Sequence, residues 1–189
     1  DLNALWLTDV ALRAVCVLAL DRFGDYTGDG GAAPVRDVAA NLLGVSVAHL
    51  PAKITKLLID LLFKLAGDEH WEARHGGFLG LSAVLKIHRE IDWAYDPSVL
   101  NLFIKVIQKD VDDLQGTAAA VLHVLLQNLI DQQSPKAAAT FLADFAGGSN
   151  LSKVLWKALS SLDDLSSAGT PIMKLLSLLY SSAIELFPP

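Results

Sequence analysis

Three short segments of this 189-residue chain resemble binding sites for ions or nucleotides. Residues Asp25–Gly30 (DYTGDG) begin like the calcium loop of an EF-hand, which requires a bidentate Glu at its twelfth position. That position is Arg36, a cation, so the pattern is more typical of an acidic turn. Residues Asp68–His70 (DEH) resemble the acidic box of helicases, but no Gly-Lys phosphate loop accompanies them. We therefore expect neither calcium nor nucleotide binding.

The histidines and the cysteine do not form a recognisable metal or catalytic pattern. His70 and His75 flank Glu72, but a spacing of i, i+5 places two helical histidines on different faces, unlike the i, i+4 pair of zinc proteases. Cys16 is the single cysteine and lies in the apolar run Ala14–Leu20, so we expect a buried thiol and no internal disulfide. The sequence predicts no catalytic residue, cofactor or metal in this chain.

Composition and charge exclude several classes of protein. Because 52% of the residues are hydrophobic, an intrinsically disordered chain is excluded. The longest uncharged run, Leu114–Ile130, is shorter than a membrane span of about 20 apolar residues and includes polar side chains, so we expect no membrane contact. The 15 Lys and Arg against 21 Asp and Glu give a net charge of −6, which argues against a direct nucleic-acid site. The charge favours a basic protein partner instead.

The elements that position these side chains are predicted to be helices. From Ile54 to Leu65, apolar residues recur at i, i+3, i+4, i+7, i+8 and i+11, which is a helical stripe. No stretch alternates strictly between apolar and polar residues, so the fold class is all-α. Proline at helix starts and glycine at helix ends predict helices near 5–22, from 34, 51–67, 71–89, 97–109, 112–130, 151–162 and from 170, with a further short one near 136–145.

The helix starts at Pro34–Ala40, Glu72–Phe78 and Asp113–Ala119 superimpose in register, with separations of 38 and 41 residues. Paired helices at a period near 40 residues are typical of HEAT repeats, which stack into an α-solenoid. We expect about four antiparallel helix pairs, with approximate repeats 1–50, 51–90, 91–133 and 134–189. The chain starts without Met or a signal peptide, so we interpret it as one block of a longer array.

The helix starts and turns carry a distinct pattern of charge. Acids at the starts of the second helices favour the positive end of the helix dipole, and we expect arginines there to pair with acids of the adjacent repeat. The turns inside the helix pairs all lie on one edge of such a stack. That edge holds the candidate protein-interaction residues Asp25, Asp29, Asp68, Glu69, Asp110, Asp112, Asp163 and Asp164. They are either solvated turn residues or an acidic edge that docks a basic protein.

Several segments resemble a known family in order and approximate spacing. They are LDRFGDY at 20–26, APVR at 33–36, WEARHGG at 71–77, LWKAL at 155–159, LDDLS at 162–166 and IMKLL at 172–176. Together they are similar to the N-terminal HEAT region of the TATA-binding-protein-associated Swi/Snf-type ATPases. At Gln115 the sequence departs from the arginine that this family favours.

The resemblance implies a nuclear transcription regulator that removes TATA-binding protein from promoter DNA with ATP. It implies that loops along one edge of the HEAT array grip TATA-binding protein, while a separate C-terminal ATPase acts on DNA. The matched segment lacks that ATPase, so we expect it to be a non-catalytic scaffold that binds TATA-binding protein. Two alternatives stay open, namely a structural spacer within the solenoid and a HEAT-type scaffold for another basic partner.

Overall fold

The computed structural model describes residues 2–22, 34–89, 97–132, 148–163 and 166–183. Within these ranges the chain forms eight α-helices and no strand, which confirms the all-α prediction. The chain folds into two compact units, a first unit, Asp1–Arg89, and a second unit, Glu90–Pro189. Each unit is a stack of helix pairs, as in an α-solenoid. The predicted short helix near 136–145 lies outside the described residues.

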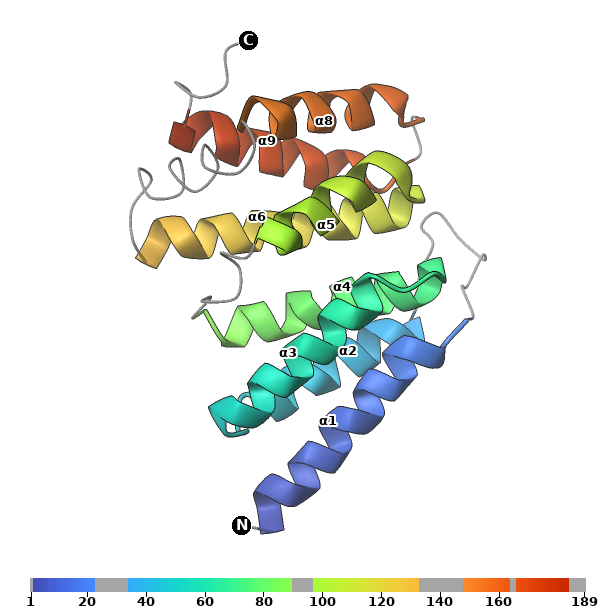
Figure 1. Cartoon of the computed structure of the whole chain (residues 1–189), viewed down its shortest axis with the longest axis vertical. Helices are drawn as coiled ribbons and strands as arrows, with labels where there is room; N and C mark the ends of the chain where they lie inside the picture. Colours follow the sequence, from blue (N-terminus) through green and yellow to red (C-terminus); the bar gives the residue numbers. More distant parts are fainter. Residues whose placement is uncertain (1, 23–33, 90–96, 133–147, 164–165, 184–189) are drawn as a thin grey trace. The chain divides into compact units, whose positions relative to one another are not determined.

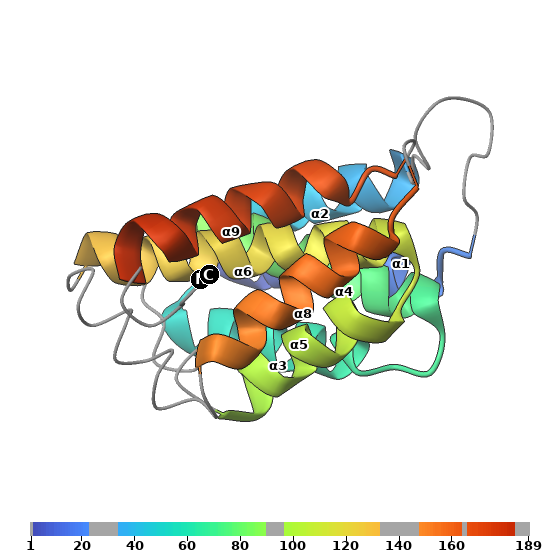
Figure 2. The same cartoon turned by 90° about the horizontal axis from the view of Figure 1, so that it is seen from above.

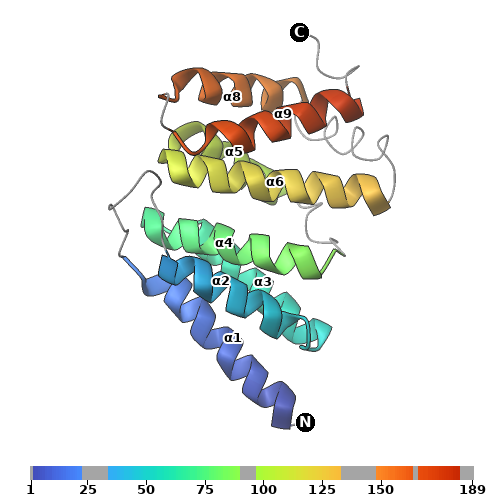
Figure 3. The same ribbon diagram turned by 180° about the vertical axis from the view of Figure 1, so that it is seen from behind.

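The first unit contains α1 (Leu2–Leu20), α2 (Pro34–Val47), α3 (Ala52–Ala66) and α4 (Trp71–Ile87). The helices form two layers, because α1 packs beside α3 while α2 packs beside α4 (Figures 1 and 3). Fully buried apolar side chains from all four helices, including Leu18, Leu43, Leu62 and Phe78, fill the space between the layers. Because this core packs the four helices together, it holds in place the turns that join the two helices of each pair.

The second unit contains α5 (Pro97–Lys109), α6 (Asp112–Gln132), α8 (Gly148–Ser161) and α9 (Gly169–Ala183). Its layers repeat the same scheme, with α5 beside α8 and α6 beside α9 (Figure 2). Phe103, Ile107, Leu114 and Leu175 are among its fully buried side chains. The helix α8 begins at Gly148, three residues before the predicted start, so the glycine expected to break the chain opens the helix instead.

One prediction about a buried side chain is wrong, and a second helix shows the same effect. Cys16 is exposed, because α1 turns Ala14, Val15 and Leu18 toward its neighbours and Cys16 away from them. On α3 the buried face runs through Thr55, Leu58, Ile59, Leu62 and Ala66, whereas Leu57 and Leu61 are exposed. Both helices are apolar on more than one side, so the spacing of apolar residues does not determine which side faces the core.

One helix among the described residues, α1, is long and apolar enough to span a membrane by length and composition alone. It carries an exposed ion pair between Asp9 and Arg13, whose carboxylate and guanidinium approach to 2.7 Å. Core helices of soluble proteins and signal sequences meet the same criterion. The expectation that the chain makes no membrane contact therefore stays a prediction.

Candidate protein-interaction edge

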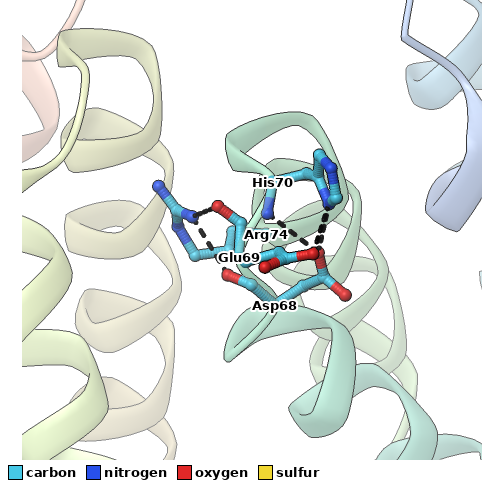
Figure 4. A network of polar contacts seen from close by, with 4 residues as sticks. All are labelled: Asp68, Glu69, His70 and Arg74. Atoms are coloured by element: carbon cyan, nitrogen blue, oxygen red, sulfur yellow. Dashed lines mark hydrogen bonds and ion pairs between the residues drawn. The ribbon is translucent and has the colours of Figure 1, made fainter.

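The first acidic turn joins α3 to α4 and contains Asp68 and Glu69 (Figure 4). The Asp68 carboxylate accepts hydrogen bonds from the backbone N–H of His70 at 2.9 Å and from the His70 ring at 3.1 Å. The backbone N–H of His70 chiefly, and then its ring, hold the pKa of Asp68 below its usual range. Glu69 is far more exposed than Asp68, with 87% against 37% of the side chain accessible. Glu69 therefore presents the more available carboxylate.

Arg74 ties this turn to the first turns of α4. Its Nη1 donates to the carbonyl oxygens of Asp68 at 3.0 Å and of Glu69 at 2.8 Å (Figure 4). The guanidinium thus satisfies carbonyls that follow the end of α3, which would otherwise need water. From the sequence we expected arginines at the helix starts to pair with acids of the adjacent repeat. The Arg74 contacts drawn in Figure 4 run instead to main-chain oxygens of the same helix pair.

The second acidic turn joins α5 to α6. Asp110 accepts a hydrogen bond from the backbone N–H of Val111 at 3.1 Å, and Asp112 is exposed at the first residue of α6. Gln115 is buried, and its Nε2 donates to the carbonyl oxygen of Asp110 at 2.9 Å. Gln115 and Arg74 occupy the same place in the repeat, and both donate to a carbonyl of the preceding turn. Gln115 thus makes the same hydrogen bond to the preceding turn as Arg74 does, but it carries no positive charge.

The third acidic turn joins α8 to α9 and lies beside the second one. The Ser167 hydroxyl donates to the Asp113 carboxylate at 2.8 Å. The backbone also comes close, since a Cβ placed on Gly116 would lie 2.9 Å from the Cα of Ala168. Asp163, at the end of α8, is exposed. In the second unit the structure therefore brings Asp112, Asp113 and Asp163 to the same end of the helix stack.

These contacts place some of the predicted residues but do not test whether they bind a partner. Asp68 and Glu69 share one turn of the first unit, while Asp110, Asp112 and Asp163 belong to two adjoining turns of the second unit. Asp25, Asp29 and Asp164 lie outside the described residues. Whether the described acids contact a partner stays a prediction. Among the residues that the structure describes, no group of three or more His, Cys, Asp or Glu is arranged to hold a metal ion.

The excess of acid is concentrated in the second unit. Residues 90–189 contain 11 Asp and Glu against 6 Lys and Arg, so their formal charge is −5. Residues 1–89 contain 10 acids against 9 bases, so their formal charge is −1. Nearly all of the net charge of −6 therefore belongs to the unit in which two acidic turns adjoin. A basic surface would be attracted chiefly to this unit.

A buried polar cluster around Arg36 was not found by sequence reasoning. Arg36 is 1% exposed, and its Nε lies 3.4 Å from the Asp21 carboxylate at the end of α1. Its Nη1 is 2.8 Å from Nδ1 of His75, and its guanidinium carbon lies 5.4 Å from the centre of the Trp71 ring. Because arginine only donates, His75 Nδ1 must accept here, so the imidazole is neutral with its proton on Nε2. The cluster joins α1, α2 and α4.

No family model matches the chain. Its sequence is 38% identical over 176 residues to TATA-binding protein-associated factor 172 of Homo sapiens. It is 32% identical over 192 residues to TATA-binding protein-associated factor mot1 of Schizosaccharomyces pombe, and 33% identical over 181 residues to TATA-binding protein-associated factor BTAF1 of Arabidopsis thaliana.

These alignments cover 93%, 96% and 95% of the chain, but only 9%, 9% and 8% of the respective relatives. The chain thus spans less than a tenth of the length of the proteins that it matches. By its sequence the chain belongs to the family of TATA-binding protein-associated factors, as the counterpart of one short segment of those proteins.

Proposed function

We propose that this chain is a non-catalytic scaffold segment that docks TATA-binding protein through its acidic turns. In this proposal it belongs to a nuclear regulator that displaces TATA-binding protein from promoter DNA. A separate ATPase outside the chain supplies the energy, as the resemblance of the motifs implies. The contacts fall on the turns α3–α4, α5–α6 and α8–α9, and the strongest attraction comes from the second unit.

One observation carries this proposal. In the second unit, whose formal charge is −5, the turn that carries Asp163 adjoins the turn that carries Asp112 and Asp113, through the hydrogen bond from Ser167 to Asp113. Acidic surfaces steer basic partners and raise the rate of encounter, and this attraction falls as salt screens it. The relatives are named for their association with TATA-binding protein, which supports it as the partner.

The test reverses the charge of three exposed acids, one from each described acidic turn. The variant combines Glu69→Lys, Asp112→Lys and Asp163→Lys in the full chain, and a matched control combines Asp9→Lys, Asp60→Lys and Asp131→Lys on exposed positions along α1, α3 and α6. We expect the triple variant to bind TATA-binding protein at least about tenfold more weakly at low salt and with a flatter salt dependence. Equal affinities for the triple variant and the control would show that these turns are not the docking surface.

A second candidate function is a structural spacer that stacks between other helices of a longer chain. It is favoured by the outer face of the first helix pair, which is apolar yet exposed. On α2, Val38 is 67% exposed although it lies opposite buried Ala40 and Leu43. Exposed apolar patches of this kind mark contact surfaces. The exposed apolar residues of the pair are Leu2, Leu5, Trp6, Leu12, Val17, Leu20, Val35, Val38, Leu42 and Val45.

The spacer is tested by making this face polar. Replacing Val38 and Val45 with Ser leaves the buried core intact, so we expect an unchanged thermal midpoint and weaker self-association in analytical ultracentrifugation. The spacer function on its own also predicts that the wild-type chain does not bind TATA-binding protein and tolerates changes in its acidic turns. Strong binding that depends on those turns would favour the scaffold instead.

A further inference from the structure

The cations of the second unit are gathered on one of its two layers. Four of its 6 Lys and Arg lie on α5 and α8, and all four are exposed, namely Lys105, Lys109, Lys153 and Lys157. Neither helix contains an Asp or Glu. Because α5 packs beside α8 in one layer, the exposed sides of both helices turn away from α6 and α9 (Figures 1 and 3). These four lysines define the basic face.

The lysines of the basic face are available to a partner. Among the described residues, none of the four ammonium groups forms an ion pair with a carboxylate. Lys109 borders the acidic turn at Asp110, whereas the other three lie further inside their helices. The second unit thus separates its charge, since its described acids lie in turns and at helix ends while the cations follow one layer.

An exposed tryptophan lies among these lysines. Trp156 is 47% exposed and stands about one helical turn from Lys153 and next to Lys157. Its indole Nε1 donates to the Tyr180 hydroxyl of α9 at 3.0 Å, and the Ser152 hydroxyl lies 3.0 Å from the same oxygen. The hydrogen bond holds the ring in place before a partner arrives, so docking on it costs little side-chain entropy. Tryptophan is also one of the residues in which interfaces concentrate their binding energy.

The charge and the ring together favour an acidic protein segment over nucleic acid. The unit as a whole carries a formal charge of −5, which repels a long polyanion that extends beyond the lysines. A short acidic segment meets chiefly the lysines, because salt screens charges that lie more than about 10 Å away. An apolar side chain in the same segment can pack on the indole, which offers a large apolar surface.

We propose that the basic face docks a short acidic segment of a protein, with an apolar side chain of that segment packed on Trp156. This partner differs from the one that the acidic turns attract, because its charge is opposite and it meets the α5–α8 layer. The second unit would then carry two docking surfaces of opposite charge. The charged contacts weaken as salt rises, whereas the contact with the indole does not depend on salt.

The experiment measures fluorescence anisotropy of three labelled probes with the full chain over a salt series. The first probe is a peptide of Asp and Glu with one central Leu, the second has Gly in place of that Leu, and the third is a DNA duplex. We expect the Leu peptide to bind at low salt, to weaken as salt rises, and to bind more tightly than the Gly peptide. No binding of the Leu peptide at low salt would overturn the proposal.

The lysines are tested by charge reversal. We expect Lys153→Glu with Lys157→Glu to weaken binding of the Leu peptide at least about tenfold at low salt and to flatten the salt dependence. The matched control combines Lys86→Glu and Lys174→Glu, which are exposed on α4 and α9 and change the net charge equally. An equal loss in both double variants would mean that the net charge attracts the peptide and the basic face does not.

The tryptophan is tested by truncation. Trp156→Ala should weaken binding of the Leu peptide at least about fivefold at every salt concentration and leave the Gly peptide unaffected. Trp6→Ala is the matched control, since Trp6 is 65% exposed on α1 of the first unit. Both positions are exposed, so circular dichroism should show both variants folded. An unchanged affinity of the Trp156→Ala variant for the Leu peptide would remove the anchor and overturn the proposal.

The DNA duplex distinguishes a protein segment from nucleic acid. Tighter binding of the duplex than of the Leu peptide, lost on reversal of Lys153 and Lys157, would show a nucleic-acid site and overturn the proposal. These results are independent of the docking of TATA-binding protein, which is measured with variants of the acidic turns. Failure of one proposal therefore leaves the other in place.

Discussion

At the scale of single residues, the first unit buries a charged guanidinium in the cluster around Arg36. Burying a guanidinium is unfavourable unless it is paired, and here the Asp21 carboxylate, the neutral His75 ring and the Trp71 ring surround it. The carbonyl oxygen of Glu72 adds a fourth contact at 3.4 Å. Removing the arginine would leave a buried carboxylate opposite an apolar side chain.

We therefore expect Arg36→Met to lower the free energy of unfolding by about 3–5 kcal/mol, the range for breaking one side of a buried ion pair. Arg13→Met is the control, because the Arg13–Asp9 pair is exposed to solvent and such pairs contribute little to stability. Urea unfolding of both variants gives the comparison. Similar losses for the two arginines would mean that the buried cluster does not stabilise the unit.

His123 gives a second prediction at this scale. Burial on α6, and then the positive charge of Lys174, lower the pKa of His123 below its usual value. Replacing Lys174 with Met should raise the pKa of His123 while leaving it below that value, since burial is the larger cause. Titration of the ring by NMR measures this, and an unchanged pKa would place the charge of Lys174 too far away to act.

The sign of the effect on stability follows from the same shift. The folded pKa of His123 is lower than the unfolded one, so the unfolded chain binds more protons in mild acid. The contribution of His123 to stability is therefore complete above its unfolded pKa of about 6.5 and is lost as pH falls through the folded pKa. The Lys174→Met variant should lose less stability than wild type over that window.

At the scale of helices, the contact between α1 and α4 depends on Gly76. A Cβ at this position would collide with the backbone carbonyl of Leu18, which cannot rotate away as a side chain can. Small residues recur in the register of the three helix starts, at Ala39, Gly77 and Ala118, and all three are buried. The neighbouring Gly76 had no counterpart in that register, so only the structure identifies it.

Gly76→Ala should destabilise the first unit by about 1–3 kcal/mol, the usual range for overpacking in a core. Gly169→Ala is a matched control in the second unit, because nothing lies within 4 Å of its added Cβ. Thermal unfolding should show a lower midpoint for Gly76→Ala and an equal or higher one for Gly169→Ala, since Ala favours helices. A stable Gly76→Ala chain would contradict the close approach of α1 and α4.

The sequence predicts where the helices start more accurately than which side of each helix is buried, and the difference has a physical cause. Prolines at positions 34 and 97 and acids at 112 and 113 determine helix starts by local chemistry, so those bounds are confirmed. The orientation of α1 and α3 depends instead on their neighbours, because both helices are apolar around most of their circumference. Exposed Cys16 and Leu61 follow from that dependence.

At the scale of the whole chain, the sequence predicts where the turns fall but not which turns and helices lie against one another. Helix pairing places the acids in turns, and sequence reasoning identified Asp68, Glu69, Asp110, Asp112 and Asp163 as turn residues. The hydrogen bond from Ser167 to Asp113 links residues 54 positions apart in the chain, and the hydrogen bond from Trp156 to Tyr180 depends on how α8 meets α9. Such contacts between distant residues leave no local pattern in one sequence.

The central claim is that this chain binds TATA-binding protein directly, by charge. The most direct measurement is the affinity of the wild-type 189-residue chain for purified TATA-binding protein over a series of salt concentrations. We predict measurable binding at low salt, which weakens steadily as salt rises, because solvated carboxylates supply much of the attraction. Absence of binding at every salt concentration, or an affinity that salt does not change, would contradict the claim.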